Sequence, residues 1–153
     1  MALSPPTPKV CAGVGRTEPS AAEGHGVRRF SILYAEQAPL VADAVRETLE
    51  AEGWRVEVCA RGDEALRLLE NGGRFDLLIL DFCLPVLDGL ELARHARALP
   101  CAVRTPIIMF TDSEVEGDAR RAGVDAYLRK PRGVYSLVLT ATGLLMRGRE
   151  KGS

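Results

Sequence analysis

The sequence predicts one α/β domain in which five parallel strands form an open, doubly wound sheet with helices on both faces. Between residues 30 and 147, short apolar runs alternate five times with segments of helical periodicity. The runs "LLIL" and "IIMF" lack the alternation of a half-solvated strand, so they indicate strands buried on both sides. No two runs are joined by a hairpin turn, so the connections should be right-handed crossovers between parallel strands.

The five expected strands are short, as strands in globular proteins usually are. They cover "FSILYA" (30–35), "WRVEVC" (54–59), "FDLLIL" (75–80), "PIIMFT" (106–111) and "AYLRK" (126–130).

Five helices are expected to follow these strands. They lie in "PLVADAVRETLEAEG", "GDEALRLLENGG", "DGLELARHARALP", "SEVEGDARRAG" and "GVYSLVLTATGLLMRG". The first helix should place one apolar stripe on the sheet, formed by Leu40, Val41, Ala44, Val45 and Leu49. In the fourth segment, Ser113 to Glu116 resembles a capping box with Ser113 as the cap.

The two ends of the chain lack such patterns. Residues 1–29 hold four of the nine prolines and no apolar periodicity, which predicts a disordered N-terminal tail. The last helix is expected to end near residue 147, and residues 148–153 should then form a short C-terminal tail without an output domain.

Composition argues against several classes of partner. The net charge of −1 offers little electrostatic attraction to nucleic acid. No apolar run approaches the ~20 residues of a membrane span, and the N-terminal residues lack the apolar core expected of a secretory signal. The four cysteines form no CxxC pair, and two histidines do not complete a usual zinc site. We therefore expect a cytoplasmic protein with reduced thiols and with neither nucleic acid nor membrane as a partner.

Polar residues follow the strands at the points where the strands end. They are Glu36 and Gln37, then Asp81, then Thr111 and Asp112, and finally Lys130. Because the carboxyl ends of parallel strands meet at one edge of a sheet, these residues should share one rim. A carboxylate there can attack a phosphoryl group and become an acyl phosphate. The phosphoryl charge would be offset by a cation such as Mg²⁺ and by Lys130.

The stretches "ILYAEQAPLV", "DLLILDFCLPVLDGLEL", "TPIIMFTD" and "AGVDAYLRKP", in this order, resemble the receiver domain of bacterial two-component response regulators over residues 30–147. The resemblance implies a flavodoxin-like fold with strand order 2-1-3-4-5. It implies that Asp81 takes a phosphoryl group from a histidine kinase or phosphotransfer protein, with Lys130 paired to that group. Thr111 would move to bond the phosphoryl group, and Tyr127 would turn inward in step.

The resemblance also implies a Mg²⁺ site formed by Glu36, Asp81 and the main-chain carbonyl of Cys83. The family usually has two acids after the first strand, whereas here the second position is Gln37, an uncharged and therefore weak ligand. Mg²⁺ affinity should fall, and phosphorylation should be slow or absent. Asp112 stands where the family has a small residue, so it either obstructs the entrance or turns inward and compensates for Gln37.

Two other interpretations stay open. One is a receiver-like binding module that no longer becomes phosphorylated and signals through protein contacts alone, which Gln37 and Asp112 favour. The other is a small phosphatase with Asp81 as its nucleophile. That chemistry commonly needs a second aspartate two residues later, where Cys83 stands. A signalling protein that is not an enzyme is therefore the main expectation.

The last helix carries two apolar stripes. One should cover the sheet and consists of Val134, Leu137, Val138, Ala141, Leu144 and Leu145. Tyr135, Leu139 and Met146 lie on a second face, about 130° away. Exposed apolar surface often marks an interaction site, and the resemblance points to the fourth and fifth helices. We expect a downstream protein or a homodimer to bind this second face, unless the tail or the fourth helix covers it.

Overall fold

The computed structural model describes residues 29–152, so the tail predicted for residues 1–29 lies almost wholly outside the described part. Five strands form one sheet: β1 (Ser31–Ala35), β2 (Arg55–Cys59), β3 (Leu77–Leu80), β4 (Ile107–Thr111) and β5 (Ala126–Arg129). Neighbouring strands all pair in parallel, in the order β2-β1-β3-β4-β5. The predicted fold class and strand order are confirmed.

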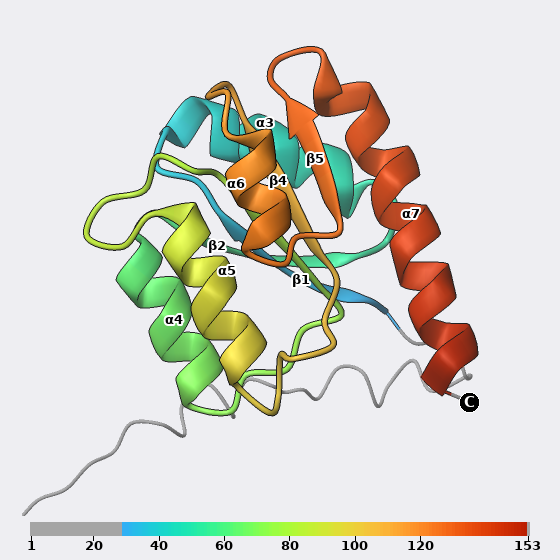
Figure 1. Ribbon diagram of the computed structural model, residues 1–153. Helices are drawn as coiled ribbons and strands as arrows, with labels where there is room; N and C mark the ends of the chain where they lie inside the picture. The colour runs from blue at the N-terminus through green and yellow to red at the C-terminus, as the bar shows by residue number, and fades with distance from the viewer. Residues whose placement is uncertain (1–28, 153) are drawn as a thin grey trace, which may run out of the picture.

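Five helices cover the sheet in two layers: α3 (Pro39–Glu50), α4 (Gly62–Glu70), α5 (Gly89–Ala98), α6 (Glu116–Arg121) and α7 (Gly133–Gly152). Helices α3 and α7 pack on one face, and α4, α5 and α6 on the other (Figure 1). Every residue of β3 and β4 is buried, as expected for strands that are covered on both sides. None of the helices in the described range is long and apolar enough to cross a membrane.

Helix α3 presents a different stripe from the one expected. Ala42, Val45 and Leu49 are buried, whereas Leu40 is 84% exposed and Ala44 is also exposed. At about 100° per residue, Ala44 lies a quarter turn from Val45 and Leu40 lies still farther round. Leu40 and Ala44 were therefore wrongly placed on the buried stripe.

The capping box predicted at Ser113 is wrong. Helix α6 begins at Glu116, after Val115, and no side chain caps its first turn. The physical reason is the hydroxyl of Tyr127, which donates to the carbonyl of Ser113 and accepts from the N–H of Val115 at 3.1 Å. These two bonds hold residues 113–115 outside the helix, so α6 is shorter than the sequence pattern suggests.

Helix α7 confirms the predicted sheet-facing stripe. Leu137, Ala141, Leu144 and Leu145 are buried, and Val134 and Val138 pack against the same core. The helix does not end near residue 147 but continues to Gly152, where a short C-terminal tail was expected.

The connection from β3 to α5 is fixed by close backbone contacts. The N–H of Gly89 donates to the carbonyl of Phe82 at 2.9 Å, and the Asp88 side chain caps α5 by accepting from the N–H of Glu91 at 2.9 Å. A Cβ on Gly89 would overlap the carbonyl oxygen of Asp81. The start of α5 therefore packs directly on the Asp81 peptide, which leaves room only for glycine.

Candidate functional site

Three of the predicted rim side chains meet at the carboxyl ends of β1, β3 and β5. Glu36 and Asp81 are both buried, with relative exposures of 2% and 5%. The Lys130 ammonium is bonded to Glu36 Oε1 and lies 3.0 Å from Asp81 Oδ2. Lys130 thus bridges the two carboxylates, and the convergence expected from strand topology is present for these three residues.

Glu36 is held by the chain on both of its carboxylate oxygens. Besides Lys130, Oε1 accepts from the Tyr34 hydroxyl at 3.3 Å, and Oε2 accepts from the N–H of Ala38 at 3.0 Å. Burial, followed by the charge of Glu36, raises the pKa of Tyr34, so this phenol stays a neutral donor. Tyr34 was not among the predicted site residues, although a tyrosine inside a buried strand needs a partner for its hydroxyl.

Lys130 stays a cation in this site. Burial alone lowers its pKa, but the hydrogen bonds and charges of Glu36 and Asp81 outweigh burial, so the net pKa lies above the ordinary lysine value. The ammonium also lies 5.6 Å from the centroid of the Phe110 ring, a distance suited to a cation–π contact. With two carboxylates and one ammonium, the cluster carries one net negative charge.

Gln37 does not present its carbonyl oxygen as expected. Its amide nitrogen Nε2 donates to the main-chain carbonyl of Cys83 at 2.9 Å. The opposite orientation of the amide would set two acceptor oxygens against each other, so the donor must face Cys83. The carbonyl that the resemblance assigns to Mg²⁺ is therefore bonded to a side chain of the same protein.

The residues at the rim fit a divalent cation poorly in this arrangement. Among the described residues, no three His, Cys, Asp or Glu side chains come together in a way that could hold a metal ion. Asp112 is exposed, and its main-chain carbonyl accepts from Arg129 Nη2 at 3.4 Å. The exposed position of Asp112 gives no support to the prediction that its carboxylate turns inward and compensates for the missing charge at Gln37.

Thr111 and Tyr127 lie on the strands next to Lys130, and both contact Ser113. Thr111 is fully buried, and its hydroxyl accepts from the N–H of Ser113 at 3.2 Å. The half-buried Tyr127 bonds the carbonyl of the same residue. The Cys83 thiol lies 3.6 Å from the Ser113 hydroxyl, which links the loop after β3 to the loop after β4.

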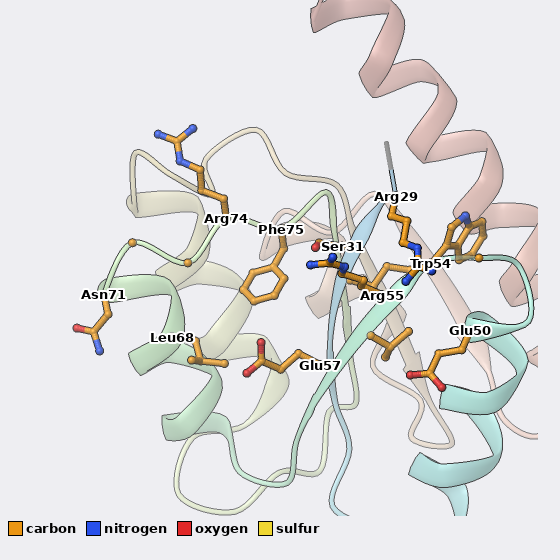
Figure 2. Close-up of a pocket in the computed structure, with 15 residues that line it drawn as sticks. Arg29, Ser31, Glu50, Trp54, Arg55, Glu57, Leu68, Asn71, Arg74 and Phe75 are labelled. Carbon is orange, nitrogen blue, oxygen red and sulfur yellow. The ribbon is translucent and has the colours of Figure 1, made fainter. Parts of the chain in front are cut away.

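A separate groove of about 750 Å³ opens at the opposite edge of the sheet. Arg29, Arg55 and Arg74 line it together with Trp54 and Phe75, as Figure 2 shows. Helices α3 and α4 end here, so cationic side chains suit the negative ends of their dipoles. None of the rim residues lines this groove, which places it outside the predicted site.

This chain matches a known protein family and several curated relatives. Residues 32–141 match the family model of the response regulator receiver domain. The phosphate regulon transcriptional regulatory protein PhoB of Rhizobium meliloti is 38% identical over 122 residues, which are 77% of this chain and 53% of the relative. The transcriptional regulatory protein TrcR of Mycobacterium tuberculosis is 35% identical over 82% of this chain and 48% of its own length. The chain thus spans about half the length of these curated relatives.

Solved structures agree with the family match. A CheY-like receiver domain protein of Methanospirillum hungatei superposes with a TM-score of 0.72 at 28% identity, covering 80% of this chain and 98% of that one. The receiver domain of the sensor histidine kinase PA1611 of Pseudomonas aeruginosa, described with a magnesium ion coordinated in its active-site cleft, gives a TM-score of 0.68 at 32% identity over 78% and 96%. On its sequence, its strand order and the match over residues 32–141, this chain belongs to the response regulator receiver family.

Proposed function

We propose that Asp81 is a phosphoacceptor that takes a phosphoryl group from a histidine kinase or phosphotransfer protein. The supporting observation is the Lys130 ammonium, 3.0 Å from Asp81 Oδ2 and bonded to Glu36. A carboxylate oxygen of Asp81 forms the new bond to phosphorus, and the bond from phosphorus to the donor breaks, with its electron pair leaving on the donor. Lys130 then offsets part of the charge on the phosphoryl oxygens.

The switch that follows would use Thr111 and Tyr127. The Thr111 hydroxyl, now bonded by the N–H of Ser113, would turn to the phosphoryl group. Tyr127 would leave the carbonyl of Ser113 and fill the space behind Thr111. Residues 113–115 are held outside α6 by Tyr127, so its departure would free this segment to rearrange.

Acetyl phosphate tests the acceptor assignment directly. Incubation of the protein with acetyl phosphate and Mg²⁺ is expected to give an ~80 Da adduct on the peptide that contains Asp81, detected by mass spectrometry. Asp81→Asn should abolish the adduct, because the amide is a far weaker nucleophile than the carboxylate. The matched control is Asp43→Asn, an exposed aspartate of α3 that pairs with Arg46 outside the site and whose loss should leave the adduct in place. If the Asp81→Asn protein still forms the adduct, another residue is the acceptor.

A second candidate function is a receiver-like module that signals without phosphorylation. The contact that favours it is the bond from the Gln37 amide to the Cys83 carbonyl, at 2.9 Å. This bond occupies the carbonyl oxygen that a metal ion would otherwise use. Wild-type protein that forms no adduct with acetyl phosphate, with or without Mg²⁺, would establish this function over the first.

We further propose that the second face of α7 binds a downstream protein or a second copy of this chain. Tyr135, Leu139 and Met146 are 89%, 76% and 45% exposed, so neither α6 nor any other described element covers them. Helix α7, which carries these three residues, contacts β5, and β5 holds Tyr127 and leads directly to Lys130, so a change at the site is expected to reach this helix.

Charge placed on this face should remove the interaction. Leu139→Glu/Met146→Glu is expected to lower the mass measured by light scattering, or to abolish capture of a purified partner, without unfolding the domain. Ser136→Glu/Arg147→Glu alters exposed polar positions on the same helix and serves as the matched control. A folded Leu139→Glu/Met146→Glu protein with wild-type mass and wild-type partner binding would exclude the face as an interface.

A further inference from the structure

The rim oxygens that a cation would use already have donors from the protein itself. Glu36 is bonded by Lys130, Tyr34 and the N–H of Ala38. Asp81 is bonded by Lys130 on one oxygen and by the N–H of Cys83, at 3.3 Å, on the other. The Cys83 carbonyl accepts from Gln37 at 2.9 Å. Lys130 balances the charge of the two acids, so its removal would change more than one contact. Gln37 is neutral and exposed, so a substitution there removes its bond to Cys83 without changing the charge of the site.

We propose that Gln37 acts as a cap on the Cys83 carbonyl that lowers the affinity of the rim for divalent cations, and not as a weak ligand that raises it. This inference deepens the proposed function and depends on it only for the location of the cation site. The cap is a positioning role, because the amide touches the carbonyl and not a reacting atom.

The physical basis is a competition for one oxygen. A cation such as Mg²⁺ needs oxygen ligands and cannot use an amide N–H₂ group, so the Gln37 bond must break before the carbonyl can bind the ion. A typical hydrogen bond in a protein contributes enough to lower the cation's affinity by roughly 2- to 10-fold. If Gln37 were instead a weak ligand, its removal would lower the affinity for the cation, which is the opposite change.

The Cys83 carbonyl should keep its position when the cap is removed. The N–H of Cys83 is bonded to Asp81, and its thiol lies 3.6 Å from the Ser113 hydroxyl. These contacts are independent of Gln37. Gln37→Leu therefore frees the carbonyl without adding a charge or a ligand, which makes it the decisive variant.

The chain offers an unusually simple spectroscopic readout, because it contains one glutamine and one asparagine. In a ¹H–¹⁵N spectrum the side-chain amide signals therefore come only from Gln37 and Asn71. Asn71 is exposed and lies at the opposite edge of the sheet, so it is an internal reference. In the unphosphorylated wild type, the Gln37 amide protons should exchange with water more slowly than those of Asn71.

Mg²⁺ titration of unphosphorylated protein, followed by the backbone amides of Asp81 and Cys83, tests the sign of the effect. Gln37→Leu is expected to bind Mg²⁺ roughly 2- to 10-fold more tightly than wild type. Gln37→Asp, which also adds a carboxylate, should gain roughly tenfold or more. Asn71→Leu removes the other side-chain amide and should leave Mg²⁺ affinity unchanged.

The outcomes separate the cap from the proposed function. Mg²⁺ binding by Gln37→Leu that is equal to wild type or weaker overturns the cap, and so do Gln37 amide protons that exchange as fast as those of Asn71. The second measurement uses only wild-type protein, so it does not depend on how well a variant folds. A missing adduct at Asp81, together with tighter binding by Gln37→Leu, would reject phosphorylation while supporting the cap.

Discussion

Lys130→Met is expected to lower the free energy of unfolding at neutral pH by about 3 kcal/mol, because it leaves two buried carboxylates without their shared cation. The side chains of Glu36 and Asp81 are only 1% and 7% exposed, and that of Lys130 is 15% exposed. Water therefore cannot replace the ammonium well at either acid. Methionine keeps much of the lysine's length and apolar volume, so the loss should come from charge and not from packing.

A second substitution should recover much of that loss. In Lys130→Met/Glu36→Gln one of the two unpaired charges is gone, and the glutamine can still accept from the N–H of Ala38, as Glu36 does at 3.0 Å. Urea unfolding of the wild type, both single variants and the double variant gives the coupling energy between the two sites. We expect the double variant to be more stable than Lys130→Met by more than 1 kcal/mol, roughly the net worth of one hydrogen bond.

The neighbouring residue supplies the control. Arg129 pairs with Glu114 at 3.3 Å, but both side chains are well exposed, at 48% and 81%. Such surface ion pairs contribute little, so Arg129→Met should change stability by less than about 0.5 kcal/mol. Equal effects of Lys130→Met and Arg129→Met would contradict the bridging role of Lys130.

The sequence predicts the strands and their order well because apolar runs are a local signal. Five runs separated by helical segments leave few alternatives to a parallel sheet, and β1 to β5 begin and end within two residues of the expected limits. The positions of the rim residues can be predicted from the same topology, since Glu36, Asp81 and Lys130 each come directly after a strand. That these residues lie together can therefore be predicted without knowing any side-chain contact.

Errors arise where a distant contact decides the local structure. Ser113 was predicted as a helix cap, but the hydroxyl of Tyr127, fourteen residues away, holds its carbonyl instead. The orientation of the Gln37 amide depends on Cys83, which is separated from it by 46 residues. Composition and spacing carry no information about either bond. The error at Leu40 has a different cause, because the buried face of α3 was itself placed at the wrong angle around the helix.

Gly89→Ala is expected to destabilise the domain by about 3 kcal/mol, since no side-chain movement can relieve the overlap that it creates. The added Cβ would meet the Asp81 carbonyl oxygen and lie 2.9 Å from its carbonyl carbon and 3.0 Å from Phe82 Cα. All three atoms belong to the backbone of the loop that carries Asp81. The folded fraction of the Gly89→Ala protein should therefore also lose the transfer of a phosphoryl group from acetyl phosphate to Asp81.

Gly143→Ala is the matched control, since it makes the same chemical change where space is free. Gly143 lies inside α7, and a Cβ there would meet nothing within 4 Å. Alanine in a helix interior is favoured over glycine, so this variant should be more stable than wild type by about 0.5–1 kcal/mol. Thermal unfolding of both variants measures the contrast. Gly89→Ala with wild-type stability would show that α5 can move away from the Asp81 peptide at little cost, and that the glycine is not required there.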